Sequence, residues 1–200
     1  MRVILLSEMS RVHQHVIDTL PDLRKGRVVI IDSASGKPKP GDVRGGTAVK
    51  AYTEAGAQVE VLDLLEDGAV DISDATVVHF TGGDPFRLLK AIRQTDFDKA
   101  METRMADETF AVVGSSAGAM VLGRDIAHAG ILCDASQVAD TTGLGWIDGL
   151  VMPHLDAKGA AADKIRSFVD EHPNMDWLLL NDGDVQVRQV VAEAEAQPGW

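Results

Sequence analysis

The chain has 200 residues, of which 45% are hydrophobic and 25% are charged, and its formal net charge is -12. This length and balance predict one domain with a substantial core, spanning residues 1–200. The negative charge repels nucleic-acid phosphates and anionic membranes, so we expect neither as a partner. Cys133 is the single cysteine, which allows no intramolecular disulfide and fits a reducing compartment.

The amino-terminal apolar run, MRVILLSEMS, is too short for a signal peptide and lacks a small-residue cleavage site. No stretch of the sequence approaches the roughly 20 apolar residues that a membrane-spanning helix needs. Together with the lone cysteine, these features predict a soluble, cytoplasmic protein.

Apolar strands alternate with helices along most of the chain. The expected strands are Arg2–Ser7, Arg27–Asp32, Val59–Leu64, Ala75–Thr81, Thr109–Val113 and Leu150–His154. The expected helices follow Ser10, Asp84 and Ser116 and cover Thr47–Ala55, Phe97–Met105 and Ala160–Val169. Trp177–Arg188 is typical of a hairpin, with Asp182-Gly183 as its turn. The alternation predicts an α/β three-layer sandwich with a mostly parallel central sheet, helices on both faces and a C-terminal antiparallel hairpin.

Two segments carry no strand or helix signal. Ser35–Gly46 is rich in proline and glycine and holds Lys37, Lys39 and Arg44, which make a locally basic patch. A solvated connection is the simpler interpretation of this segment, and a mobile loop near a site is the alternative. The tail from Glu193 is polar, and we expect it to be frayed.

The segment from Thr109 to Leu122 is the main functional candidate, because it predicts a buried strand, a tight turn and then a helix. The turn contains the G-x-S-x-G pattern GSSAG, centred on Ser116. That pattern can hold a serine on a strained strand-to-helix turn with its hydroxyl exposed at the carboxyl edge of a sheet. The Ala117 amide would then point outward at a helix N-terminus, where it can stabilise developing negative charge. The same pattern also occurs in ordinary strand-to-helix turns, so its context must decide.

Two other features fall at the carboxyl ends of predicted strands. The glycine pair Gly82-Gly83 precedes Asp84, whose capping role explains the aspartate but not two consecutive glycines. Their amides can approach a ligand closely, because no Cβ intervenes. His154 ends another strand, where a general base for Ser116 would lie, although a lone histidine at a strand end is otherwise ordinary. Because the carboxyl ends of parallel strands share one edge, we expect a single site there.

The sequence gives no sign of a metal or an organic cofactor. It contains no H-E-x-x-H and no paired cysteines. Gly143-Leu144-Gly145 begins like a dinucleotide fingerprint, but Asp148 occupies the place of the third glycine. We therefore expect no cofactor and no metal site.

Three blocks of sequence together resemble the peptidase E (aspartyl dipeptidase) family of serine peptidases, family S51. They are GSSAGA around Ser116, FTGGDPFRLL from Phe80, and GLGW with the later VMPH that ends at His154. The resemblance implies a class I glutamine-amidotransferase-like α/β fold. It also implies Ser116 as the nucleophile, His154 as the base, and the amides of Gly83 and Ala117 as the oxyanion hole. Amidotransferases of similar fold carry cysteine at the elbow, so a serine there indicates peptidase chemistry.

The resemblance also implies an acid that completes a Ser-His-acid triad, in the irregular segment between the elbow helix and the histidine. Asp134 matches this position best, and Asp140 and Asp125 are the alternatives. Such an acid accepts a hydrogen bond from one imidazole nitrogen, fixes the tautomer and stabilises the imidazolium.

The chain departs from the family pattern in two places. The family shows Gly-Gly-Asn-Thr where this chain has Gly-Gly-Asp-Pro, and Asp84 would oppose catalysis if its carboxylate faced the oxyanion. The family's arginine that recognises a substrate aspartate lies in the helix after the histidine, where Ala161 stands here. Lys158 is near that position, and Lys164 and Arg166 are the substrate-binding candidates.

The function expected is a serine peptidase that hydrolyses short peptides, in particular dipeptides with N-terminal aspartate, through a triad and an acyl-enzyme. The expected partner is a small peptide substrate. A homodimer is common for such domains, although the sequence reveals no interface. Two alternatives stay open: a hydrolase of another amide, β-aspartyl or cyanophycin-type, and a non-catalytic binding protein on the same fold.

Overall fold

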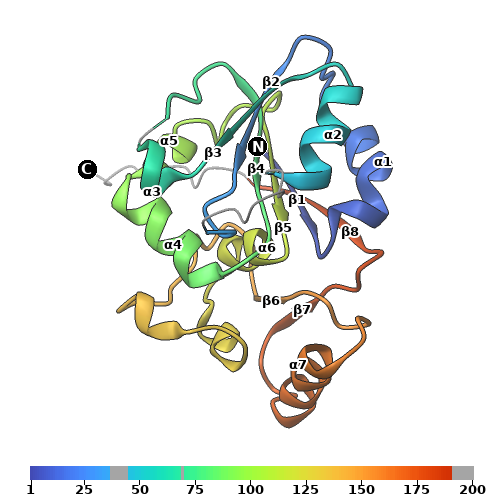
Figure 1. Ribbon diagram of the computed structural model, residues 1–200, viewed down its shortest axis with the longest axis vertical. Coiled ribbons are helices and arrows are strands. Elements are labelled where there is room, and N and C mark those ends of the chain that lie inside the picture. The colour runs from blue at the N-terminus through green and yellow to red at the C-terminus, as the bar shows by residue number, and fades with distance from the viewer. Residues whose placement is uncertain (37–44, 69, 191–200) are drawn as a thin grey trace, which may run out of the picture.

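The central sheet of the protein has six strands in the order β3-β2-β4-β5-β1-β8 (Figure 1). The computed structural model describes residues 1–36, 45–68 and 70–190. The strands are β1 (Arg2–Leu6), β2 (Arg27–Ile31), β3 (Gln58–Leu62), β4 (Ala75–Phe80), β5 (Ala111–Ser115) and β8 (Val185–Gln189). All neighbouring pairs are parallel except β1 with β8, which is antiparallel.

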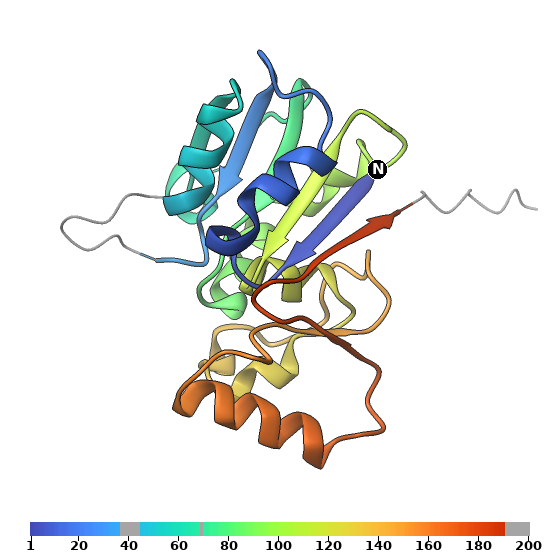
Figure 2. The same ribbon diagram turned by 90° about the vertical axis from the view of Figure 1, so that its right-hand side faces the viewer.

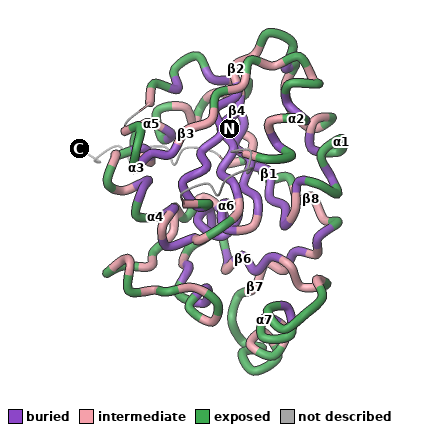
Figure 3. Tube along the Cα trace, viewed as in Figure 1, coloured by how far each residue is buried: buried purple, intermediate pink, exposed green. Residues whose placement is uncertain are grey.

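Helices cover both faces of this sheet, which is why its inner strands are largely buried and mostly apolar (Figure 3). One face carries α1 (Met9–Thr19) and α2 (Gly46–Glu54). The other carries α4 (Pro85–Gln94), α5 (Phe97–Glu102) and α6 (Ala117–Leu122), with the short α3 (Leu64–Asp67) beside α4. The expected three-layer α/β arrangement is confirmed.

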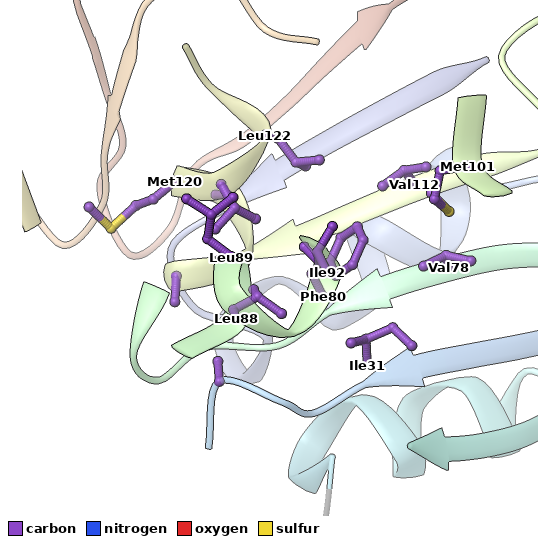
Figure 4. Packing of buried hydrophobic residues seen from close by; sticks show 14 of the residues in the cluster. Ile31, Val78, Phe80, Leu88, Leu89, Ile92, Met101, Val112, Met120 and Leu122 are labelled. Carbon is purple, nitrogen blue, oxygen red and sulfur yellow. The ribbon is translucent and has the colours of Figure 1, made fainter. Parts of the chain in front are cut away.

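The two layers of core follow from the alternation of side chains along each strand. On the α4 side, Phe80 and Val112 pack against Leu89 and Ile92 of α4 (Figure 4). Helix α4 starts abruptly because Asp84 accepts hydrogen bonds from the first free amides and Pro85 stands at the first helical position.

A smaller unit lies beyond the carboxyl ends of the central strands, toward which the arrows of β2 and β5 point in Figure 2. It contains the two-stranded parallel sheet of β6 (Leu150–Met152) and β7 (Trp177–Leu179) and the helix α7 (Ala160–Glu171). Two short 3-10 segments, η1 (Ala127–Ile131) and η2 (Ala135–Gln137), precede it in the chain.

The expected C-terminal hairpin is wrong. A turn does form, since the Asp184 amide donates to the Asn181 carbonyl over 3.1 Å. The strands on its two sides belong to different sheets, however, because β7 pairs with β6 and β8 pairs with β1. The turn chemistry was recognised correctly, but turn residues do not determine which partner each flanking strand finds.

Two further expectations fall outside the described residues. They are the basic loop with Lys37, Lys39 and Arg44, and the tail from Glu193. Within the residues that are described, no helix has the length and apolar character needed to cross a membrane.

Candidate active site

Ser116 occupies the sharp turn between β5 and α6, with φ 50° and ψ -112°. This conformation is strained for a residue with a Cβ, and the surrounding structure holds it in place. The Ser116 amide donates to the Leu6 carbonyl over 2.9 Å, and the Gly118 amide donates to the Thr81 carbonyl over 3.1 Å. Gly118 is required there, because a Cβ would lie 2.1 Å from the Phe80 carbonyl oxygen. The predicted elbow geometry is therefore present.

His154 reaches the elbow from the end of β6. Its Nε2 lies 2.8 Å from the Ser116 Oγ. Its backbone also has a positive φ, 64°, and its amide donates to the Ser7 Oγ over 3.0 Å. The Ser7 hydroxyl in turn donates to the Leu180 carbonyl over 3.1 Å. Ser7 is 2% exposed, so a buried serine from the end of β1 fixes the backbone that carries the imidazole.

The carboxylate beside His154 belongs to Asp182, whose Oδ1 lies 2.6 Å from the His154 Nδ1. Asp182 is 5% exposed, and its amide donates to the Asp156 Oδ1 over 2.7 Å. Arg11 Nη2 lies 3.8 Å from its second carboxylate oxygen. Because an ionised carboxylate only accepts, the Nδ1 carries the proton and the Nε2 lone pair faces the serine hydroxyl.

The expectation that Asp134 contacts the histidine is wrong. Its side chain accepts from the Ser136 amide over 2.9 Å and caps η2, and this hydrogen bonding lowers its pKa. The two alternatives also stabilise local turns: Asp140 accepts from Thr142, and Asp125 accepts from the Ala127 amide. Aspartates followed closely by free amides are typical turn residues, which explains why this segment contains three of them.

The expected oxyanion donors both border the serine. Ala117 is the first residue of α6, where a helical amide has no partner inside the helix. Gly83 has φ 138°, and a Cβ on it would lie 2.3 Å from the Ala34 carbonyl oxygen, so only glycine fits. A Cβ on Gly82 would lie 3.1 Å from the Ser116 Cβ, which shows how closely this turn approaches the nucleophile.

Both oxygens of the Asp84 carboxylate accept hydrogen bonds. Its Oδ1 accepts from the amides of Phe86 and Arg87, as an N-cap does. Its Oδ2 accepts from the Gln137 Nε2 over 2.6 Å. Both oxygens are held by donors of α4 and η2, so Asp84 takes the N-cap role rather than standing as a free carboxylate.

An apolar pocket opens beside Ser116 and His154, with about 410 Å³ of empty space that includes its open mouth. Its apolar lining includes Met120, Ile131, Leu132, Met152, Pro153 and Ile165. Gly83 borders the same pocket, and His128 is its second histidine. Burial lowers the pKa of His128, and its Nε2 donates to the Val151 carbonyl over 3.0 Å, so the ring is neutral at pH 7.

The structure does not bring the expected substrate-binding cations to this pocket. Arg166 donates to the carbonyls of Leu155 and Ala157, each over 2.9 Å, and pairs with Asp163. Its guanidinium therefore secures the loop that follows His154. Lys164 is exposed on α7, and neither side chain is among the residues that line the pocket.

Beneath the elbow lies a buried polar chain that sequence reasoning missed. The Tyr52 hydroxyl lies 2.9 Å from the His79 Nδ1, and the His79 Nε2 lies 2.6 Å from the Ser115 Oγ. Burial raises the pKa of Tyr52 and lowers that of His79 to about 3, so the ring is neutral. His79 and Ser115 lie within mostly apolar strands, and a polar residue inside such a run was the available signal.

Potential metal ligands are not clustered in the described part of the chain. There, no group of three or more His, Cys, Asp or Glu side chains is arranged to hold an ion.

Comparison with known proteins identifies the family. The sequence model of Peptidase family S51 matches residues 3–189. The chain belongs to peptidase family S51. The family expected from the three sequence blocks is thus confirmed.

Among curated proteins, cyanophycinases from Trichormus variabilis and Nostoc sp. are each 29% identical to the chain over 161 residues. These alignments cover 75% of this chain and 53% of each cyanophycinase, so the S51 chain spans about half the length of these relatives.

Among solved structures, a Listeria monocytogenes EGD-e protein assigned to peptidase E has a TM-score of 0.75 at 20% identity, covering 94% of this chain and 98% of that one. A peptidase from an acI-B1 Actinobacterium has a TM-score of 0.65 at 19% identity, covering 94% and 83%. Both share the fold.

Proposed function

We propose that this S51 protein is a serine peptidase that hydrolyses short peptides through Ser116, His154 and Asp182. One observation carries the proposal: an unbroken chain of hydrogen bonds runs from the Asp182 carboxylate through the imidazole to the serine hydroxyl, over 2.6 Å and 2.8 Å. A serine, a base and an orienting acid in this relation are the requirements for nucleophilic catalysis.

In the proposed reaction, the His154 Nε2 takes the proton of the Ser116 hydroxyl as the Oγ attacks the peptide carbonyl. The amides of Gly83 and Ala117 would donate to the oxyanion of the tetrahedral intermediate. The imidazolium then gives its proton to the departing amine, which leaves an acyl-enzyme. Water attacks the ester, His154 accepts the proton of the water, and the free acid leaves as Ser116 regains its proton.

Preference for N-terminal aspartate is the narrower form of this proposal, and the resemblance to aspartyl dipeptidases supports it. It requires a cation at the substrate carboxylate, and neither of the expected candidates, Arg166 and Lys164, lines the pocket, which weighs against this narrower form. Hydrolysis of another amide, of the cyanophycin type, is a second candidate favoured by the 29% identity with cyanophycinases. The continuous triad geometry argues against a non-catalytic role. A peptide as partner, the homodimer and the cytoplasmic location stay predictions.

The test is the Ser116→Ala variant, assayed on Xaa-p-nitroanilides and Xaa-Leu dipeptides. We expect turnover by the wild type and its loss in the variant, with the same unfolding transition for both. A serine-directed phosphonate should label Ser116. Ser115→Ala is the matched control, because its hydroxyl points to His79 and labelling should persist. An active Ser116→Ala variant would refute the proposal.

A further inference from the structure

The pocket beside the nucleophile has an uncharged lining. Among the described residues that border it, none is Asp, Glu, Lys or Arg. Its two histidines carry no positive charge to pair with a carboxylate. His154 is held by Asp182 and Ser116, and His128 is neutral, with its Nε2 bonded to a backbone carbonyl and its buried Nδ1 without a hydrogen-bond partner. A substrate carboxylate placed here would lose its hydration and gain no opposite charge, which is strongly unfavourable.

Three arginines near the site, all within the described residues, are paired with other groups. The Arg166 guanidinium is used by two carbonyls and Asp163, as described above. Arg87 pairs with the buried carboxylate of Asp63 over 2.7 Å. Arg11 lies behind the triad, against Asp182 and Glu8.

The apolar lining extends from the reacting groups to the surface. Met120 of α6 and Met152 of β6 lie within the pocket, and Ile165 closes it from α7. Leu132 also borders the pocket and is 47% exposed, which is unusual for a large aliphatic side chain. Flexible methionines adapt to aliphatic side chains of different shape. An exposed leucine at the edge of an apolar pocket indicates a surface that an apolar ligand covers.

We propose that this pocket receives the side chain of the residue whose carbonyl Ser116 attacks, and that this side chain is uncharged and aliphatic, of the leucine or methionine type. The inference rests on the proposed serine peptidase function and gives it a substrate class. The pocket is assigned to the acyl residue because Ser116 and Gly83 both border it, and these groups would hold the attacked carbonyl. The S51 chain would thus be a leucine-type rather than an aspartyl peptidase.

The test measures covalent labelling of Ser116 by three diphenyl α-aminoalkylphosphonates that carry the side chains of leucine, asparagine and aspartate. In this reaction the Oγ bonds to phosphorus, phenoxide leaves and His154 accepts the serine proton. Mass spectrometry gives the second-order rate constants. We expect the rate constant of the leucine probe to exceed that of the aspartate probe by about 100-fold, with the asparagine probe between them. An apolar pocket disfavours a charged side chain more than a neutral polar one.

A variant adds the missing charge at an exposed position. Leu132→Arg should slow labelling by the leucine probe about tenfold and speed labelling by the aspartate probe. The ratio of the leucine to the aspartate rate constant should therefore fall. Ser136→Arg is the matched control, because it adds the same charge on neighbouring η2 without bordering the pocket, and its ratio should equal that of the wild type.

These experiments distinguish failure of the aliphatic pocket from failure of the proposed peptidase function. Faster labelling by the aspartate probe would overturn the aliphatic pocket and leave the serine peptidase proposal standing. The aliphatic pocket would also be overturned if Leu132→Arg left the ratio of the leucine and aspartate rate constants unchanged. Absence of labelling by all three probes, together with absence of turnover, would refute the peptidase proposal and this inference with it.

Discussion

At the scale of single residues, Asp182 is the feature of the site that the sequence did not assign. His154 was placed by its position at the carboxyl end of a strand, and the elbow motif placed Ser116. Asp182 stands in an Asp-Gly pair after WLLLN and was interpreted as part of a hairpin turn. It is also an acid at the carboxyl end of an apolar strand, the same signal that had identified the histidine. Asp182 as a turn residue and Asp182 as a catalytic acid differ only in the strand that pairs with β7. The sequence of a short strand does not specify its pairing partner.

Replacing this acid tests its role directly. We expect Asp182→Asn to lower kcat by about 10⁴-fold, because an amide no longer enforces the tautomer with a free Nε2 lone pair. Steady-state kinetics on the best peptide substrate measures the effect.

Asp134→Asn is the control for that substitution, since the asparagine still caps η2 and lies away from His154. Its kcat should stay within about twofold of the wild type, as for a surface substitution. A large loss in Asp134→Asn with little in Asp182→Asn would restore the acid expected from the family resemblance.

At the scale of elements, the site depends on how closely α6 approaches β4. The elbow turn was predictable from GSSAG because strained turns and close contacts both need glycine. The close contact between α6 and β4 was not predictable, because it joins Gly118 to the Phe80 carbonyl, which is far away in the sequence. The fold of the central sheet was also predictable, because apolar strands separated by helices are compatible with few topologies. The parallel pair β6-β7 was missed, because three-residue strands carry no periodicity.

Gly118→Ala should therefore damage both stability and activity. The added Cβ would lie 2.1 Å from a backbone oxygen, so α6 must shift away from β4. We expect a loss of about 1–3 kcal/mol in the free energy of unfolding, as for other overpacked sites, and a marked fall in kcat. Urea denaturation and kinetics provide the two measurements.

Gly130→Ala is the matched substitution in η1. Its Cβ would meet nothing closer than 3.8 Å, so the unfolding free energy should change by less than about 0.5 kcal/mol. If both alanine variants were equally stable and active, the contact between α6 and β4 would not be what sets the elbow.

At the scale of the whole molecule, the buried chain from Tyr52 through His79 to Ser115 connects a helix on one face of the sheet to the strand that carries the nucleophile. The neutral ring satisfies one donor and one acceptor without charge. Protonation would require a charge at a position that is 1% exposed. Burial therefore favours the neutral imidazole in this network.

We expect the protein to lose stability as the pH is lowered, because of His79. Burial lowers the pKa of His79 from 6.5 to about 3, so between these values the unfolded chain binds a proton that the folded chain does not. Stability conferred by the neutral ring is complete above pH 6.5 and falls as the pH drops toward 3, by at most about 1.4 kcal/mol per unit from this group. His128, whose pKa is also lowered by burial, acts in the same direction.

Urea denaturation of wild type and His79→Gln between pH 7.5 and 4.5 isolates the contribution of His79, because the other titrating groups are common to both proteins. We expect the variant to be less stable at pH 7.5, since an amide does not reproduce both hydrogen bonds of the ring. We also expect its stability to fall less steeply with acid. Equal slopes in the two proteins would mean that the folded protein protonates His79 as readily as the unfolded chain does. The link between α2 and the elbow would then rest on packing rather than on the neutral imidazole.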